Sequence, residues 1–227
     1  MLSFIGPNQV FSFDTQINTH LKGFLILIHP DFLWGTHLEA KIKKFEFFEY
    51  HANEALFLSD KEEKVINTIK NIIYQEHQHS IDHFSSDLII SQLDTLFTYS
   101  DRFYNRQFIT RKKANHSMVS KMDEILERYF CSNMLVEEGI PTVQHLSEQL
   151  HLSPNYLSRL VKNITGQSPQ QHIHHKLIHL AKTKITTTDL SIGEIALALG
   201  FEHSQSFSKF FKAKTNYSPI EFRQLYN

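Results

Sequence analysis

The chain has 227 residues, enough for one large domain or two of ordinary size. With 41% hydrophobic and 21% charged residues it can build a packed core, and no apolar run approaches the roughly 20 residues of a membrane-spanning helix. Cys131 is the only cysteine, which excludes an internal disulfide and a thiolate-based zinc finger. The first residues lack a secretory signal pattern, so a cytoplasmic protein without a membrane partner is expected.

The formal charge is near zero overall but unevenly distributed. The chain contains 23 Lys and Arg residues against 24 Asp and Glu residues. From residue 141 onward there are nine basic and five acidic residues, a net charge of +4, and the first 140 residues are correspondingly acidic. This division predicts two domains with different partners.

The first fifty residues predict short strands, followed by helices. Val10–Phe13, Phe24–His29 and Phe45–Phe48 are apolar segments separated by glycine- and proline-containing turns. From Ser59 the apolar residues recur at helical intervals, and Ser59 and Glu62 have the spacing of a capping box. The sequence therefore predicts a small β segment and then a change to helix.

A second helix is predicted from about Asp82 to Phe108, with one broad apolar stripe. The stripe either packs on the β segment or forms a two-fold dimer interface, and the sequence leaves both alternatives open. The residues predicted for such an interface are Leu88, Gln92, Leu96 and Tyr99. The polar, aperiodic stretch 109–119 is interpreted as a linker, and a further helix is expected from about Ser120 to Cys131.

After residue 140 the sequence predicts short helices bounded by turn chemistry. Ser153, Ser168 and Ser218 each stand as a capping serine before a first-position proline. Gly166 and Asn216 stand where helices end, and both tolerate the left-handed conformation. The predicted helices are Thr142–Leu150, Pro154–Thr165, Pro169–Lys184, Ile192–Leu199, Ser204–Lys214 and Pro219–Leu225.

This second half contains an internal repeat. Residues 157–169 match residues 207–219 at an offset of fifty, and apolar positions upstream match at an offset of forty-nine. Self-similarity on this scale indicates one supersecondary unit used twice. Each copy is two short helices joined by a tight turn, the pattern of a helix-turn-helix whose second helix lies in the major groove of DNA.

In each second helix, apolar core positions alternate with polar outward positions. The residues predicted to face the core are Tyr156, Leu157, Leu160, Val161, Phe207, Phe210 and Phe211. The outward residues are suited to base edges and phosphates and include no acid, and they are Asn155, Ser158, Arg159, Lys162, Ser204, Gln205, Ser208, Lys209 and Lys212. The helix between the copies spans roughly 25 Å, which suits two recognition helices near one DNA turn apart.

The segments TVQHLSEQLHLSPNYLSRLVKNITGQSP and DLSIGEIALALGFEHSQSFSKFFKAKTNYSP resemble the paired helix-turn-helix units of the AraC/XylS family of transcription regulators. The resemblance covers about residues 120–227, and Asn216 stands where the motif usually has glycine. It implies double-stranded DNA as a partner, with RNA polymerase as a further candidate. It also implies base contacts from Asn155, Ser158, Arg159, Ser204, Gln205 and Lys209, and phosphate contacts from Lys162 and Lys212.

Members of this family commonly carry an N-terminal cupin-like β-barrel that binds a small effector, followed by a helical pair used for dimerisation. The first half of the sequence resembles the end of such a domain. Fifty residues supply about four strands, whereas a barrel needs about eight to enclose a ligand. The front of the barrel is therefore expected to be missing and no complete effector pocket is predicted. Exposed sheet edges favour a homodimer.

These observations predict a mainly α chain in three parts. Residues 1–108 form a partial cupin-like β segment with a helical dimerisation region, residues 109–119 a linker, and residues 120–227 a seven-helix DNA-binding domain with a linker helix between its two units. The predicted function is a sequence-specific transcription regulator that reads two adjacent major-groove segments. The alternative is a truncated, non-sensing regulator that dimerises or competes with full-length relatives.

Other site classes have little support. The pairs His79/His83 and His175/His179 stand four residues apart, but neither has an accompanying Glu-x-x-His or cysteine, so no metal is expected. The sequence contains no G-x-S-x-G, no phosphate-cradling glycine loop and no paired-carboxylate pattern, so neither an enzyme nor a cofactor is predicted. A DNA-repair methyl acceptor is a known partner of this type of domain, but it needs reactive cysteines, and Cys131 stands alone.

Overall fold

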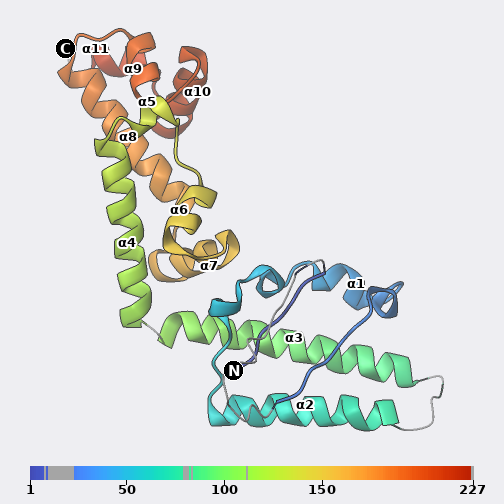
Figure 1. Cartoon of the computed structure of the whole chain (residues 1–227). Coiled ribbons are helices and arrows are strands. Elements are labelled where there is room, and N and C mark those ends of the chain that lie inside the picture. The colour runs from blue at the N-terminus through green and yellow to red at the C-terminus, as the bar shows by residue number, and fades with distance from the viewer. Residues whose placement is uncertain (8, 10–22, 79–81, 83, 111, 226–227) are drawn as a thin grey trace. The chain divides into compact units, whose positions relative to one another are not determined.

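In a computed structural model, the chain forms two compact units, Met1–Thr110 and Arg111–Asn227. The structure describes residues 1–7, 9, 23–78, 82, 84–110 and 112–225. Among these residues no helix combines the length and the apolar character that crossing a membrane requires. The predicted mainly α class is confirmed, and Figure 1 shows each unit built from helices.

The N-terminal unit is organised around a pair of antiparallel helices, α2 (Asp60–Gln78) and α3 (Ser85–Thr110), which lie side by side in Figure 1. The Ser59 capping box begins α2 as predicted, because the Ser59 N–H donates to Glu62 Oε2 at 2.8 Å. The guanidinium of Arg106 on α3 pairs with the same carboxylate at 2.7 Å. This pairing fixes the start of α2 against α3.

The N-terminal unit contains further short elements, and an aromatic cluster packs one of them, η2, onto α3. These elements are η1 (Pro30–Leu33), α1 (His37–Ile42), η2 (Glu46–Glu49) and η3 (Ala52–Glu54). Phe47 is fully buried, and its ring centroid lies 5.7 Å from that of Tyr104 and 4.3 Å from that of Phe4. Buried aromatic side chains contribute much of the stability of a core, so this cluster can hold segments that contain little regular secondary structure.

The predicted β segment is wrong where the structure describes it. Residues 24–29 form no strand, and Phe45–Phe48 overlaps the 3-10 turn η2. The single β-bridge among the described residues joins Leu2 and Leu56. Phe45 and Phe47 pack against aromatic residues of α3. No strand lies beside them in the part of the chain that the structure describes, and an extended segment without a partner forms no ladder. The predicted strand Val10–Phe13 lies outside the described residues.

The C-terminal unit contains the helices that the sequence predicted, and it departs from the prediction in two places. The stretch predicted as a linker, 109–119, is helical from Lys112 onward, because it contains neither glycine nor proline. A four-residue helix, α5, was not predicted. The helices are α4 (Lys112–Cys131), α5 (Met134–Glu137), α6 (Val143–Leu150), α7 (Pro154–Thr165), α8 (Pro169–Thr187), α9 (Ile192–Ala198), α10 (Ser204–Thr215) and α11 (Pro219–Gln224).

The predicted caps of this unit are confirmed. The hydroxyls of Ser153, Ser168 and Ser218 each accept a backbone N–H from the first turn of α7, α8 and α11, respectively. Gly166 ends α7 at φ 77° and Asn216 ends α10 at φ 65°. Asparagine therefore adopts the left-handed geometry that the glycine adopts in the first copy.

Two glutamates complete capping boxes and link the stability of this unit to pH. Ser191 lowers the pKa of Glu194 through side-chain and backbone hydrogen bonds, and the backbone N–H of Ser218 lowers the pKa of Glu221. Because each folded pKa lies below the ordinary value of 4.5, the stabilisation is present above that pH and is lost as the pH falls through the folded pKa.

We expect Glu194→Gln/Glu221→Gln to reduce the loss of stability between pH 6 and pH 3. Glutamine keeps the capping geometry, as Gln171 does when its Oε1 accepts the Ser168 N–H at 2.8 Å, but it does not titrate. The measurement is the midpoint of urea unfolding at several pH values, monitored by far-UV circular dichroism. Glu202→Gln, which lies outside the capping boxes, is the control. A double variant with the same pH dependence as the wild type would contradict this linkage.

Candidate nucleic-acid interface

The first helix-turn-helix consists of α6, a short turn and α7. Leu146 of α6 and Leu157 and Val161 of α7 are all fully buried, so the two helices share one apolar seam. His151 ends α6 in the left-handed conformation at φ 55°, and Ser153 then caps α7. The left-handed backbone of His151 and the cap of Ser153 therefore set the turn between α6 and α7.

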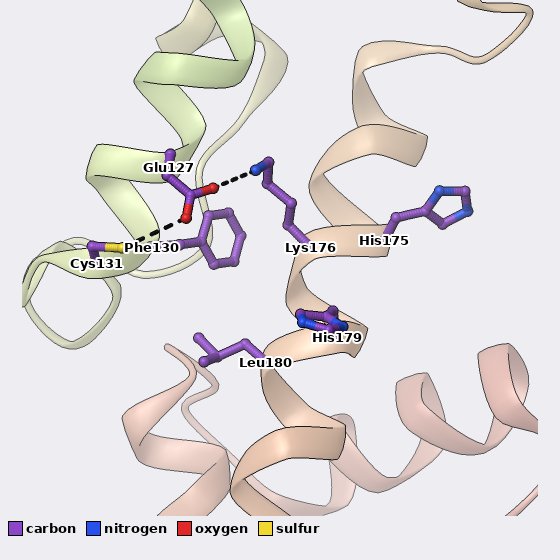
Figure 2. Close-up of a pocket in the computed structure, with 7 residues that line it drawn as sticks. All are labelled: Glu127, Phe130, Cys131, His175, Lys176, His179 and Leu180. Atoms are coloured by element: carbon purple, nitrogen blue, oxygen red, sulfur yellow. Dashed lines mark hydrogen bonds and ion pairs between the residues drawn. The ribbon is translucent and has the colours of Figure 1, made fainter.

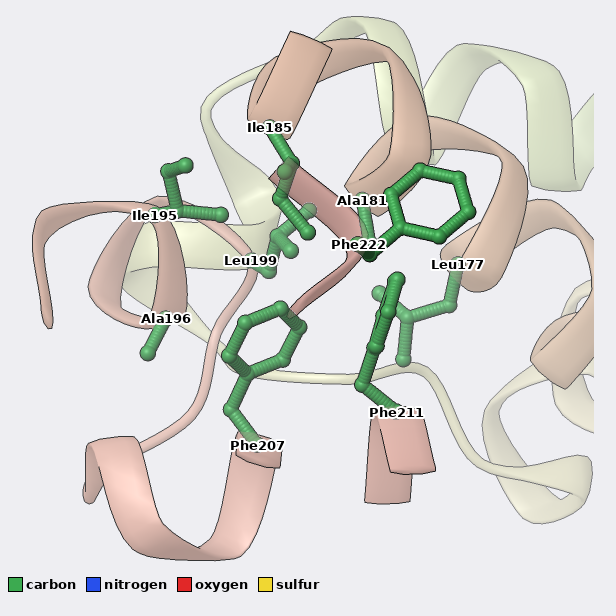
Figure 3. Packing of buried hydrophobic residues seen from close by; sticks show 9 residues of the cluster. All are labelled: Leu177, Ala181, Ile185, Ile195, Ala196, Leu199, Phe207, Phe211 and Phe222. Carbon is green, nitrogen blue, oxygen red and sulfur yellow. The ribbon is translucent and has the colours of Figure 1, made fainter. Parts of the chain in front are cut away.

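The second helix-turn-helix consists of α9, a turn at Gly200 and α10. Figure 3 shows Phe207 and Phe211 of α10 reaching into a cluster that also contains Leu177 and Ala181 of α8. Phe222 of α11 closes the cluster, with its ring centroid 5.4 Å from that of Phe211. The sequence repeat is thus a structural repeat, with bulkier aromatic side chains in its second copy.

The face of α7 that the sequence predicted to point outward is exposed to a greater degree than its core face. Tyr156, Leu157, Leu160 and Val161, which were predicted to be core residues, are buried, so this prediction is confirmed. Lys162 is exposed, and Asn155, Ser158 and Arg159 are partly exposed. A polar, acid-free row therefore lies opposite the apolar row of α7.

The corresponding face of α10 carries the same kinds of side chain. Ser204, Gln205, Lys209 and Lys212 are exposed, and the hydroxyl of the partly exposed Ser208 donates to the Ser204 carbonyl at 2.9 Å. The two predicted core residues Phe207 and Phe211 are fully buried. No acidic residue lies in α7 or α10, so neither helix would repel a polyanion.

Phe210, the third predicted core residue of α10, is only partly buried because it contacts α8 at the edge of the cluster. Its ring lies edge-to-face with that of His174, at a centroid distance of 5.1 Å. Burial lowers the pKa of His174, and the nearby Lys214 and His175 lower it further. The contact joins α10 to α8, the helix that connects the two units.

Helix α8 is the element that both units share. It has 19 residues, a length of about 28 Å, and it packs on α7 near its start and on α9 and α11 further along. Its buried row begins with Ile173 and continues through Leu177, Ala181 and Ile185 into the cluster of Figure 3. α8 therefore sets the spacing of the two units, and both units contribute to burying it.

Helix α4 braces α8, a role that sequence reasoning missed. Lys176 Nζ lies 2.6 Å from Glu127 Oε2, and one turn away His172 Nδ1 lies 3.7 Å from Asp123 Oδ1. The hydrogen bond from Lys176 and its charge lower the pKa of Glu127. The sequence did contain a signal for this contact. Asp123 and Glu127 stand four residues apart, as do His172 and Lys176, so each pair lies on one face of its helix.

A second connection joins α5 to the turn of the second unit. A Cβ atom at Gly200 would lie 2.5 Å from the Leu135 carbonyl oxygen and 3.1 Å from Gly139 Cα. Only glycine permits this approach, and Gly200 also has φ 78°. The Tyr129 hydroxyl of α4 donates to the Gly139 carbonyl at 2.9 Å, so the α5 segment is held at both ends.

A cavity of about 330 Å³ lies between α4 and α8 (Figure 2). Phe130 and Leu180 are its apolar residues, and the Lys176–Glu127 pair crosses it. Figure 2 shows His175 turned away from α4, although it stands four residues before His179.

Among the described residues no three His, Cys, Asp or Glu side chains form a group suited to a metal ion. The other pair, His79/His83, lies outside those residues.

The four residues predicted for a dimer interface on α3 do not lie together on an exposed face. Leu88 is 48% exposed, and Gln92 and Tyr99 are partly exposed. Leu96 is only 4% exposed because it packs within the N-terminal unit. The outward side of α3 therefore retains three of these residues, and the homodimer stays a prediction.

Comparison with known proteins gives a consistent family. A family model described as "Helix-turn-helix domain" matches residues 146–225. The HTH-type transcriptional activator RhaS of Salmonella schwarzengrund is 30% identical over 110 residues, 48% of this chain and 37% of that protein. The bifunctional transcriptional activator/DNA repair enzyme AdaA of Bacillus subtilis is 28% identical over 114 residues, 50% of this chain and 51% of that protein.

Among solved structures, the C-terminal domain of the two-component response regulator yesN from Fusobacterium nucleatum is 31% identical, with a TM-score of 0.41, and the match covers 46% of this chain and 95% of that one. The chain covers about half or less of the length of the curated relatives named above. Residues 146–225 are therefore a helix-turn-helix domain, and their similarity to these regulators agrees with the resemblance to the AraC/XylS family that the sequence indicated.

We expect Gly200→Ala to destabilise the C-terminal unit by about 2–4 kcal/mol, because the added methyl group combines a left-handed backbone with a clash against the Leu135 carbonyl. Gly193→Ala is the matched control, since its Cβ would meet only Ser191 Oγ at 3.8 Å. It should be neutral or stabilising by up to about 1 kcal/mol. Equal urea midpoints for the two variants would contradict the close approach at Gly200.

Proposed function

We propose that this chain is a sequence-specific DNA-binding transcription regulator that reads two adjacent major-groove segments with α7 and α10. One observation carries the proposal: the same acid-free polar face occurs on the second helix of both helix-turn-helix units, which share α8. A helical interaction domain would not need this twice-repeated basic face. The matched relatives named as transcriptional activators support the same reading.

The outward residues divide by reach and chemistry into two groups. Those near the start of each recognition helix are assigned to base edges, where helix-turn-helix proteins make their specific contacts, and they are Asn155, Ser158, Arg159, Ser204, Gln205 and Lys209. Lys162 and Lys212 stand later on the same faces and are assigned to phosphates. Phosphate contacts position the protein, and base contacts give specificity.

The length of α8 supports engagement of both units with one DNA molecule. At about 28 Å it is close to one turn of B-DNA, roughly 34 Å. The braces from α4 and α5 restrict adjustment of this spacing within the protein. The remaining mismatch would be accommodated by bending of the DNA, which costs on the order of 1–6 kcal/mol and favours deformable sequences.

We expect Arg159→Ala and Lys209→Ala each to remove protection from one half of a footprint that spans two adjacent turns. Each lost base contact is worth about 1–3 kcal/mol. The measurement is selection of genomic fragments followed by footprinting at about 150 mM salt. Lys162→Ala is the contrasting variant, which should weaken all sequences alike and lower the salt slope by about 1. Protection confined to one half in the wild type would leave a single reading unit.

We also propose that the N-terminal unit forms a homodimer through the outward side of α3. Large apolar side chains are exposed near the end of α2 and the start of α3, and they are Ile72, Tyr74, Phe84 and Leu88. Exposed apolar side chains of this size favour association, and two copies would let a regulator hold two sites.

We expect Leu88→Glu to weaken dimerisation at least tenfold in sedimentation equilibrium at tens of micromolar, because a buried, unpaired carboxylate at the interface is costly. Ile109→Glu, at the opposite end of α3 and 56% exposed, is the matched control and should leave the association unchanged. A clean monomer for the wild type would refute the dimer, and equal effects of both variants would place the interface elsewhere.

A further inference from the structure

We infer that each helix-turn-helix of this chain reads one adenine and one guanine about two base pairs apart, and that α7 reads its guanine more stringently than α10 does. The inference rests on the proposed function, because it requires both helices to enter the major groove. It follows from a correspondence of functional groups at equivalent positions of the two copies.

The correspondence lies at two positions on each outward face. Asn155 and Gln205 are each the second residue of their helix, and both carry a carboxamide. One turn later, Arg159 and Lys209 both carry a cation. Positions i and i+4 lie on the same face of a helix. Each recognition helix therefore presents a carboxamide followed by a cation on the side opposite its buried apolar row.

These two functional groups match different purines. The oxygen of a carboxamide accepts from the N6 amino group of adenine while its NH2 group donates to N7, which gives one bidentate pair. An arginine or lysine donates to O6 and N7 of guanine. Four residues of helix advance about 6 Å, and successive bases on one strand are about 3.4 Å apart. The two purines are therefore expected about two base pairs from each other within each half-site.

The serines of the same faces add little to the choice of base. A hydroxyl both donates and accepts, so Ser158 and Ser204 fit either kind of base edge. The Ser208 hydroxyl already donates to the Ser204 carbonyl at 2.9 Å. Base preference is therefore concentrated in the carboxamide and the cation of each helix.

The two cations differ in how firmly they select guanine. The planar guanidinium of Arg159 can form two parallel hydrogen bonds to O6 and N7, whereas the ammonium of Lys209 acts as a point charge on a flexible stem. A good bidentate contact discriminates by roughly 5- to 150-fold. Guanine should therefore be more strictly required in the half-site of α7.

The decisive experiment exchanges base preference instead of removing binding. Selection from a randomised DNA library at 150 mM salt is carried out with the full chain and with Gln205→Glu. A carboxylate only accepts, and it pairs with the cytosine N4 amino group. The variant should therefore select cytosine in place of adenine in one half-site and leave the other unchanged. Gln149→Glu on α6 adds the same charge outside the recognition helices and should select the wild-type site.

A reciprocal pair tests the difference between the cations. Arg159→Lys should lower the guanine preference of its half-site, and Lys209→Arg should raise the preference of the other, each by roughly fivefold or more. Selected sites that keep adenine with Gln205→Glu, or guanine preferences that do not follow these exchanges, would overturn the inference and leave the proposed function standing. Failure of the wild type to select any site would instead refute the proposed function.

Discussion

Burial of one side of α8 holds the C-terminal unit together. Ile173, Leu177, Ala181 and Ile185 recur at intervals of four and are all buried, so this row faces protein along most of the helix. A short helix-turn-helix has too little apolar surface to be stable alone, and each copy here completes its core on the shared helix. The spacing between α7 and α10 is therefore a consequence of how both cores are built.

Two further contacts hold α8 and the second unit, with unequal strength. The Lys176–Glu127 pair couples α8 to α4, and the approach of Gly200 to the Leu135 carbonyl couples α5 to the turn that precedes α10. The ion pair is partly exposed and contributes little free energy, whereas the glycine contact admits no larger residue. Steric fit is thus a stronger constraint on the second unit than charge.

The same architecture lets two similar helices carry different outward side chains. The buried residues of α7 and α10 are set by packing, while the outward residues are exposed to a greater degree and differ between the two copies. Arginine in the first copy and lysine in the second would give the two half-sites unequal stringency. A tandem repeat in one chain permits this inequality, which two identical subunits would not.

Sequence alone determined most of the C-terminal unit because its signals are local. The serine caps, the prolines after them, Gly166 and Asn216 define helix ends through residues within one turn, and the offset of fifty revealed the duplication. The predicted strands at 24–29 and 45–48 were wrong because the conformation of a short apolar segment depends on the residues it packs against. Phe47, for example, packs against Tyr104 of α3. The brace of α4, the glycine contact of α5 and the burial of Leu96 depend on residues far apart in sequence, so only the tertiary structure decided them.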